Sequence, residues 1–463
     1  MLYNISKGED NMFDKFKENK EVIKILARLN NENSTGYIVG GAVRDTLLGI
    51  TPHDIDFATN MDYTKVKELF SEYRCNETGK AFGVLRIKTE NNEYEIAQYR
   101  KDITADNVEF VNKIEDDLSR RDFIINAMAW NKERGLVDIF EGKKDIWNKN
   151  LRFVGNPSDR IKEDPLRMLR AVRFIAKTGF TLDKESFDAL KENSYLIKDV
   201  AKERIHDELV RTMKQENYIE AIKVMKKSGL LEEIIPEIKT QYGYNQNNPH
   251  HSFELWEHTE KVLENCKNGD YITKFAALFH DIGKPSTQST DEVTGFSHYY
   301  RHEEKGAEIT RDILNRLRFT NEEKKNICSL VEKHMDFHRS ETDRTIRKMV
   351  HNIGRENTLR LAELSFADDE GKFKENRHNE LYDKVQKVIE EFDIPKVSDL
   401  RLGGFDLIEM GFAGKEIGNI KKHLLNEVLE NGVPNDFDAL YEIVKKEFIG
   451  KDKKGNDEKC LEL

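Results

Sequence analysis

The stretch that decides the fold covers residues 37–57 and reads YIVGGAVRDTLLGITPHDIDF. An apolar run enters a glycine pair, which opens a short helix with apolar residues at helical spacing. Glycines let backbone N–H groups approach an anion, and the N-terminus of a helix favours phosphate. Asp54 and Asp56 are two residues apart, so a strand would direct both carboxylates to one face. Because such carboxylates hold Mg²⁺ ions that also bind substrate phosphates, this order of features predicts nucleotidyl transfer.

Each half of this pattern also has an ordinary explanation, because a glycine pair is often only a turn and an Asp-x-Asp run is often only surface. Together, with Arg44 and Asp45 between them, the two halves resemble the signature of the class II tRNA nucleotidyltransferase and bacterial poly(A) polymerase family. The resemblance covers nearly the whole chain and is sharpest at residues 37–60, 118–130, 160–174 and 254–284.

The resemblance implies an α+β fold in four parts. It consists of a polymerase-β-like nucleotidyltransferase head (a small mixed sheet with helices), an all-α neck, an HD domain and a helical tail. The expected domains are the head at 1–155, the neck with a base-templating helix at 156–240, the HD metal-binding domain at 241–375 and a tRNA-binding tail at 376–463.

The composition is that of a soluble protein with several domains. Of its 463 residues, 35% are charged and 38% hydrophobic, and no stretch approaches the length of a membrane span. The net charge of −11 decides little about nucleic acid, because phosphate contacts depend on local basic surfaces. The four cysteines lack metal-type or disulfide-type spacing, and the N-terminus lacks a signal-peptide pattern. We therefore expect reduced thiols, a cytoplasmic location and no membrane partner.

Two further positions in the head are candidates for the same site. Glu95 lies between apolar neighbours on a predicted strand, where the resemblance implies a third carboxylate near the metal; an exposed strand glutamate is the alternative. Arg121 abuts an apolar helix, where a guanidinium can hold triphosphate oxygens bidentately; an ordinary Arg–Asp ion pair is the alternative. The resemblance implies that Asp54 and Asp56 are catalytic and hold Mg²⁺, and that Gly41, Arg44 and Arg121 bind the nucleotide.

Residues 160–174 form the second strong motif. Asp164 followed by Pro165 is a favourable helix start, and Arg167, Arg170 and Arg173 recur every three residues. A capped helix with a solvated basic face explains this pattern by itself. The resemblance implies that Asp164 and Arg167 act as a protein template for the edge of the incoming cytosine or adenine, while Arg170 and Arg173 hold phosphates or the RNA end. Asp supplies acceptors and Arg a rigid donor fork, so guanine or uracil would leave buried groups unpaired.

Histidine and aspartate recur in the second half of the chain. A His-Asp pair within an apolar helix needs a compensating charge, which a divalent metal supplies; a buried histidine without a metal is the alternative. The pattern resembles an HD domain, whose members hydrolyse phosphoester bonds with metal-bound water. It implies a site for a divalent transition metal of open identity, made by His258, His280, Asp281 and Asp368, with His302 and His334 as further candidates.

The resemblance implies an enzyme that adds C and A nucleotides from CTP and ATP to the 3′ end of the tRNA acceptor arm. Residues 101–107 are shorter than the flexible loop of members that add the whole CCA, which leads to the hypothesis of CC-only addition. Two alternatives stay open: a poly(A) polymerase of the same family, and an HD metal phosphohydrolase whose nucleotide-binding head is not catalytic. The sequence does not indicate an oligomeric state.

Overall fold

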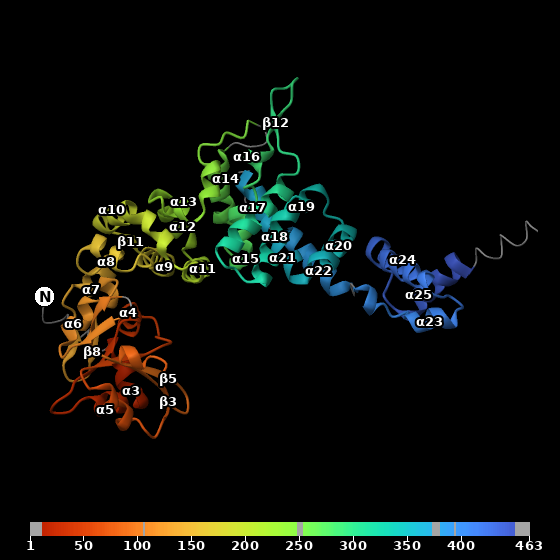
Figure 1. Cartoon of the computed structure of the whole chain (residues 1–463). Helices are drawn as coiled ribbons and strands as arrows, with labels where there is room; N and C mark the ends of the chain where they lie inside the picture. Colours follow the sequence, from red (N-terminus) through yellow and green to blue (C-terminus); the bar gives the residue numbers. More distant parts are fainter. Residues whose placement is uncertain (1–11, 105–106, 248–252, 373–379, 393–394, 450–463) are drawn as a thin grey trace, which may run out of the picture. The chain divides into compact units, whose positions relative to one another are not determined.

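The computed structural model describes residues 12–104, 107–247, 253–372, 380–392 and 395–449. The chain divides into two compact units, Met1–Pro236 and Glu237–Leu463 (Figure 1). The first unit mixes strands and helices, and the second is helical apart from one short hairpin. This confirms the α+β fold expected from the sequence, whereas the division into four domains stays a prediction.

A seven-stranded mixed sheet organises the first unit, with the strand order β3-β4-β5-β2-β1-β8-β9. β2 pairs antiparallel with β1 and parallel with β5, and the second pairing sets Asp56 directly beside Glu95. β1 is buried along its whole length, as its apolar run predicts. The strands of this sheet are β1 (Gly36–Val39), β2 (Asp56–Thr59), β3 (Arg74–Asn76), β4 (Val84–Lys88), β5 (Glu93–Gln98), β8 (Ala129–Asn131) and β9 (Gly135–Val137).

Two helices cover one face of this sheet. α3 (Lys20–Leu29) and α5 (Tyr63–Leu69) pack their apolar residues against the buried side chains of β4 and β5 in one core. A short α2 (Asp14–Glu18) precedes α3, and Asn19 separates the two. The Asn19 side chain accepts the backbone N–H groups of Glu21 and Val22, so it caps α3.

The remaining helices of the first unit gather around α9 (Arg167–Thr178), which packs against α11 and α12. Its buried face includes Leu169 and Val172, and its arginines lie on the other face. The other elements of this unit are α4 (Gly41–Leu47), η2 (Lys80–Phe82), β6 (Arg100–Thr104), β7 (Asn107–Phe110), α6 (Ile114–Ser119), η3 (Ile124–Asn126), α7 (Gly142–Trp147), β10 (Asn150–Leu151), α8 (Pro157–Glu163), β11 (Thr181–Leu182), α10 (Lys184–Asn193), η4 (Ser194–Asp199), α11 (Lys202–Met213), α12 (Tyr218–Lys227) and α13 (Leu230–Ile234).

The second unit is a helical bundle in which α14 packs against α15 and α21, and α17 against α18. A separate apolar core, including Leu424 and Val428, holds its last three α-helices together. The elements are η5 (Pro236–Gln241) at the junction, α14 (Leu255–Asn265), α15 (Tyr271–Phe279), α16 (Lys284–Thr287), β12 (Ser289–Thr290), β13 (Ser297–His298), α17 (His302–Arg316), α18 (Asn321–Lys333), α19 (Asp336–Arg339), α20 (Asp343–Ile353), α21 (Arg355–Lys372), α22 (Glu380–Glu391), η6 (Val397–Asp399), α23 (Gly404–Glu409), α24 (Lys415–Asn431), α25 (Phe437–Val444) and the π-helical turn η7 (Lys445–Ile449).

Two expectations concern the chain as a whole. Among the helices that the structure describes, none combines the length and the apolar character that a membrane span requires. Cys75, Cys266 and Cys328 are free thiols, and Cys460 lies outside the described residues.

Candidate functional site

A cleft of about 590 Å³ lies in the first unit, lined by residues of β2, β4, β5, the start of α4 and the α8–α9 junction. It brings together most of the predicted nucleotidyl-transfer residues. Those that line it are Gly41, Arg44, Asp56, Glu95, Arg121, Asp164, Arg167 and Arg170. Asp54 and Arg173 are not among its lining residues. The acids of the sheet and the predicted template pair therefore share one cleft, although they are far apart in sequence.

The acidic end of the cleft is set by the parallel pairing of β2 with β5. Asp56 is accessible to solvent, yet protein atoms crowd its carboxylate. This desolvation, with the nearby charge of Glu95, raises the pKa of Asp56 to about 6, and the charge of Arg121 only partly opposes the shift. A divalent cation would stabilise the ionised carboxylate of Asp56 beside Glu95, so this pair fits a Mg²⁺ site.

Asp54 does not lie on the strand, contrary to the sequence prediction. β2 begins at Asp56, whose partner Val39 is the last residue of β1. Beyond that pair β1 gives way to Gly40, which has a φ of 68°, so β1 offers no partner to the residues before Asp56. Asp54 is exposed in the preceding loop and adds a smaller repulsion to Asp56 than Glu95 does. It lies close enough to act on Asp56, although it stands outside the sheet.

The glycine pair and Arg121 adjoin this acidic end, because Gly40 follows Val39, the strand partner of Asp56, and the charge of Arg121 acts on Asp56. A Cβ at Gly40 would lie 2.7 Å from Nη1 of Arg121, so only glycine allows this approach. Nη2 of Arg121 donates to the buried carboxylate of Asp117 at 3.1 Å. The ion pair that was the alternative for Arg121 is therefore present, while the same guanidinium lines the cleft. Asp117 holds this guanidinium at the cleft wall.

Arg44 is buried, and neighbouring side chains hold its guanidinium while leaving part of it free to donate. Its Nε donates to Asp45 at 2.8 Å, its Nη1 donates to Asn126, and its guanidinium lies 5.2 Å from the ring centre of Phe174. These contacts hold the guanidinium of Arg44, a residue of α4, against Phe174 of α9. Its positive charge therefore lies at a defined position beside Gly41.

The predicted template pair has a different local structure from the one expected. Asp164 is the C-cap of α8, not the N-cap of the next helix, and α9 begins only at Arg167 because Pro165 interrupts the two. The carboxylate of Asp164 accepts the backbone N–H of Leu166 at 3.2 Å and Nη2 of Arg204 at 3.1 Å. Nη1 of Arg167 donates to Glu163 at 2.6 Å. Both side chains are thus oriented at the junction of two helices.

The other two arginines of this motif are bound to acids. Arg170 lines the cleft and donates from Nε to Asp122 at 2.8 Å. Burial alone would raise the pKa of Asp122, but Arg170 outweighs it and holds that pKa below its usual range. Arg173 instead donates from Nε to Glu208 of α11 at 2.6 Å and does not reach the cleft lining. The three-residue spacing therefore carries Arg173 around α9 and away from the site.

Sequence reasoning missed several polar residues of the cleft lining. They are Arg100, Arg120, Asp122, Asn126 and Arg204. Arg204 lies on α11, and its pairing with Asp164 depends on the packing of α11 against α9. Arg100 follows β5 directly, so only the sheet topology reveals its position. No spacing within one segment indicates such contacts.

A second site lies in the second unit, where the predicted HD residues form two adjoining groups. His258, His280 and Asp368 form one group, and Asp281, His302 and His334 form the other; within each, all ligand atoms lie within 4.8 Å of one another. Asp281 contacts both, because its Oδ2 is 3.2 Å from Nε2 of His280 and its Oδ1 is 3.4 Å from Nε2 of His302. All six residues are buried. Among the described residues, no third group of this kind occurs.

The hydrogen bonds of the imidazoles show that these groups fit a metal. Nδ1 of His280, His302 and His334 lies 2.7–2.8 Å from a backbone carbonyl oxygen three residues earlier. A carbonyl only accepts, so each Nδ1 carries a proton and each Nε2 is the ring atom left to bind a cation. Nε2 of His302 and Nε2 of His334 lie 3.2 Å apart, close enough for one cation to bind both.

The pKa shifts of Asp281 and His334 agree with this arrangement. Burial would raise the pKa of Asp281, but His280 and Lys284 beside it hold that pKa well below its usual range. Burial and the neighbouring His302 lower the pKa of His334 far below its usual value, which keeps this imidazole neutral. The carboxylate of Asp281 and the neutral imidazole of His334 are donors that suit a divalent transition metal.

Comparison with known proteins places both sites in one family. Family models match residues 36–152 (Poly A polymerase head domain), residues 179–242 (Probable RNA and SrmB- binding site of polymerase A) and residues 250–371 (HD domain). The crystal structure of the Bacillus stearothermophilus CCA-adding enzyme in complex with CTP has a TM-score of 0.71 and 22% identity, and the match covers 95% of this chain and 99% of that one.

Curated relatives agree with the family models. The A-adding tRNA nucleotidyltransferase of Deinococcus radiodurans is 32% identical over 342 residues, which is 72% of this chain and 76% of that enzyme. The CCA-adding enzyme of Leuconostoc mesenteroides is 26% identical over 91% of this chain and 95% of its own length. For the CCA-adding enzyme of Ligilactobacillus salivarius the identity is 39%, but the match spans only 52% of that enzyme. The chain is therefore an enzyme of the tRNA nucleotidyltransferase family, with a poly A polymerase head domain and an HD domain.

Proposed function

We propose that this enzyme adds nucleotides from CTP and ATP to the 3′ end of tRNA and releases pyrophosphate. The observation that carries the proposal is the single cleft that joins Asp56 and Glu95 to Asp164 and Arg167. The relatives named above support it, as do structural neighbours solved with CTP and with tRNA_CCA. We also expect the enzyme to work in the cytoplasm.

The residues of the cleft divide between the reacting groups and the incoming base. Asp56, Glu95 and Asp54 would hold Mg²⁺, and the chemistry that this ion would supply is activation of the 3′ hydroxyl and neutralisation of charge on the leaving pyrophosphate. Gly41, Arg44 and Arg121 hold the triphosphate. Because Arg204 orients Asp164 and Glu163 orients Arg167, the two side chains present a fixed set of acceptors and donors to a base edge. Arg170, which is bound to Asp122, supplies positive charge to the cleft wall between the reacting groups and the incoming base.

The number of nucleotides added is the open part of this proposal. The short segment 101–107 favoured CC-only addition; most of it forms the β6–β7 hairpin, while Ala105 and Asp106 lie outside the described residues. The relative from Deinococcus radiodurans, which is named an A-adding tRNA nucleotidyltransferase, favours a second candidate, A-only addition. Full CCA addition is the activity named for the relatives that match over nearly their whole length.

Three tRNA substrates distinguish these activities. The purified enzyme is incubated with tRNA lacking the whole CCA, tRNA ending in CC and intact tRNA, with CTP and ATP separately and together. CTP incorporation on the first substrate supports CC or CCA addition, and ATP incorporation on the second supports A or CCA addition. ATP-only homopolymer growth on unrelated RNA ends would identify a poly(A) polymerase, and no incorporation on any substrate would contradict the proposal.

For the second unit we propose a site for divalent transition metals that hydrolyses phosphoester bonds. The six buried donors support metal binding, and the position of Asp281 between the two groups supports two ions that share one carboxylate. Metal analysis of the purified chain gives the identity and the number of ions. Phosphate release from 2′,3′-cyclic and 2′-phosphorylated nucleotides tests the chemistry; an intact metal site without hydrolysis of either would limit the unit to a structural role.

A further inference from the structure

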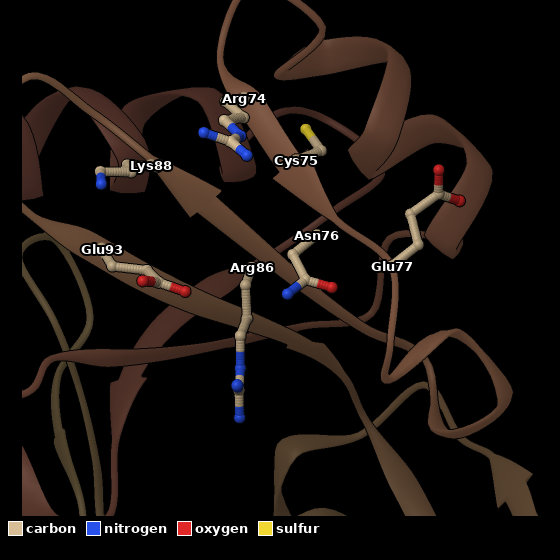
Figure 2. Close-up of a pocket in the computed structure, with 7 residues that line it drawn as sticks. All are labelled: Arg74, Cys75, Asn76, Glu77, Arg86, Lys88 and Glu93. Carbon is tan, nitrogen blue, oxygen red and sulfur yellow. The ribbon is translucent and has the colours of Figure 1, made fainter.

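A basic surface at the β3–β4–β5 end of the sheet is not used by the proposed mechanism. Arg74 of β3 with Arg86 and Lys88 of β4 lines a hollow of about 460 Å³, together with Asn76 and Glu93 of the neighbouring strands (Figure 2). We call Arg74, Arg86 and Lys88 the basic sheet face.

The strand register explains why these side chains gather there. Side chains of a strand alternate between its two faces, and Leu85 and Ile87 of β4 point into the core. Arg86 and Lys88 must therefore point to the opposite face, where both are exposed. Arg74 is the register partner of Lys88, and Glu93 is the partner of Lys88 on the other side. In Figure 2 these side chains project from neighbouring strands around the hollow.

The basic sheet face continues directly from the catalytic cleft. The same two strands contribute Val84, Glu95 and Ala97 to the cleft lining. Arg86 is the register partner of Glu95, and its Nε lies 3.1 Å from Oε2 of that residue. Glu95 in turn lies beside Asp56. Lys88 is two residues further along β4, about 7 Å from Arg86 at the usual rise of a strand. One row of side chains thus leads from Asp56 to the hollow.

Positive charge remains available on this face. Glu77, which also lines the hollow, is bound by Lys67 at 2.7 Å and by the hydroxyl of Tyr63 at 3.1 Å. Within the part of the chain that the structure describes, no ion pair or hydrogen bond engages the side chains of Arg74 or Lys88. Glu93 is the remaining acid at the hollow, so cations exceed anions there. Such a surface attracts a polyanion rather than a neutral ligand.

The order of the strands indicates which polyanion approaches the basic sheet face. The attacking oxygen and the leaving pyrophosphate lie roughly in line, on opposite sides of the transferred phosphorus. Gly41, the proposed triphosphate contact, follows β1 on one side of β2, and Glu95 lies on β5 on the other side. Asp56 is between them. The 3′ hydroxyl therefore belongs on the β5 side, and the RNA strand that carries it leaves the cleft over β4 and β3.

We propose that the basic sheet face binds the sugar-phosphate backbone of the RNA strand whose 3′ hydroxyl is extended. This inference rests on the proposed function. It assigns Arg74 and Lys88 to phosphate binding and Arg86 to the boundary between the RNA strand and the catalytic acids. The other explanation for these charges is protection of the edge strand β3 against pairing with another chain, which requires no effect on RNA binding.

The test compares two double variants of the full chain, both reversing two exposed lysine or arginine charges of the head. Arg74→Glu with Lys88→Glu changes the basic sheet face. Lys20→Glu with Lys65→Glu changes α3 and α5, which cover the other face of the sheet, and serves as the matched control. The measurements are KM for CTP, KM for tRNA lacking its CCA end at several salt concentrations, and the melting temperature. The milder Arg74→Ala with Lys88→Ala replaces the first variant if the reversal prevents folding.

The inference predicts a rise of about tenfold in KM for tRNA with little change in KM for CTP. The slope of log KM against log salt should fall by about 1.4, the value for two phosphate contacts of a single strand. The control should match the unaltered enzyme. An unchanged KM for tRNA and an unchanged slope in the first variant would overturn the inference, and so would an equal effect in the control or a rise confined to CTP. Failure of the proposed function is distinct, because the unaltered enzyme would then add no nucleotide.

Discussion

The two metal-binding regions of this chain are organised in opposite ways. In the head, Asp56 is open to solvent and only strand pairing brings it to Glu95, while Asp54 approaches from a loop. In the HD unit, six donors are buried, and backbone carbonyls fix the orientation of three imidazoles. The proposed function requires the open site to admit both a nucleotide and an RNA end. In the closed site, protein contacts already orient the donors toward one another.

Removal of the Asp56 carboxylate should produce the largest effect, a loss of nucleotide addition. Replacing Asp56 by Ala should lower the rate of nucleotide addition by about 10³-fold or more, because the metal and its charge stabilisation lose their main ligand. Addition to tRNA lacking its CCA end measures the rate, and the melting temperature should not fall. The neighbouring change Asp54→Ala should also abolish addition if the loop carboxylate is a metal ligand. Glu68→Ala on α5 is the control. Nucleotide addition retained by Asp56→Ala would contradict the role assigned to the open site of the head.

Removal of the bridging HD carboxylate should have a large effect of another kind. Asp281→Asn should release most of the bound transition metal and lower the melting temperature, because the two groups of donors lose the anionic ligand that contacts both of them. Nucleotide addition should stay within about twofold of the unaltered enzyme, since the head has its own cleft. Metal analysis, melting and addition assays check this, with Asp369→Asn as the control. Loss of addition as severe as that of Asp56→Ala would mean that the two sites are not separate.

Substitution of the proposed template residues should alter the choice of nucleotide more than the rate of its addition. Asp164→Ala should reduce the preference for CTP over UTP by about 10- to 100-fold, because one bidentate partner of the base edge is gone. Competition between labelled CTP and UTP measures the preference. Arg173→Gln is a matched control from the same motif, because Arg173 contacts Glu208 outside the cleft. Equal loss of selection in both variants would indicate a general defect of α9.

The smallest effect concerns stability and pH. The pKa of Asp56 is about 6 in the folded protein, above the value of about 3.9 in an unfolded chain. The folded state therefore binds more protons between these values, and stability falls as the pH rises through that window. Without Mg²⁺, Asp56→Asn should raise the melting temperature at pH 7.5, and the gain should vanish near pH 4. Thermal melting across this range measures it, and a gain that is equal at every pH would contradict the charge explanation.

Much of the fold was predictable because its signals are local. The apolar run of β1, the glycine pair and the amphipathic α9 follow from spacing alone, and the resemblance then supplied the order of domains. The candidate site residues on these elements were therefore predicted as well. What the sequence did not reveal depends on contacts between distant segments: Arg204 on Asp164, and Arg173 turned toward Glu208. Asp54 was misplaced because β1 ends opposite Asp56, so strand β2 begins there and its alternation does not extend to Asp54.

The most direct test of this account is a structure of the full chain with CTP and Mg²⁺ bound. The account predicts the triphosphate against Gly41 and Arg121, a metal on Asp56, and the cytosine edge within hydrogen-bond distance of Asp164 and Arg167. A nucleotide bound with its base directed away from that pair, or bound outside this cleft, would contradict it.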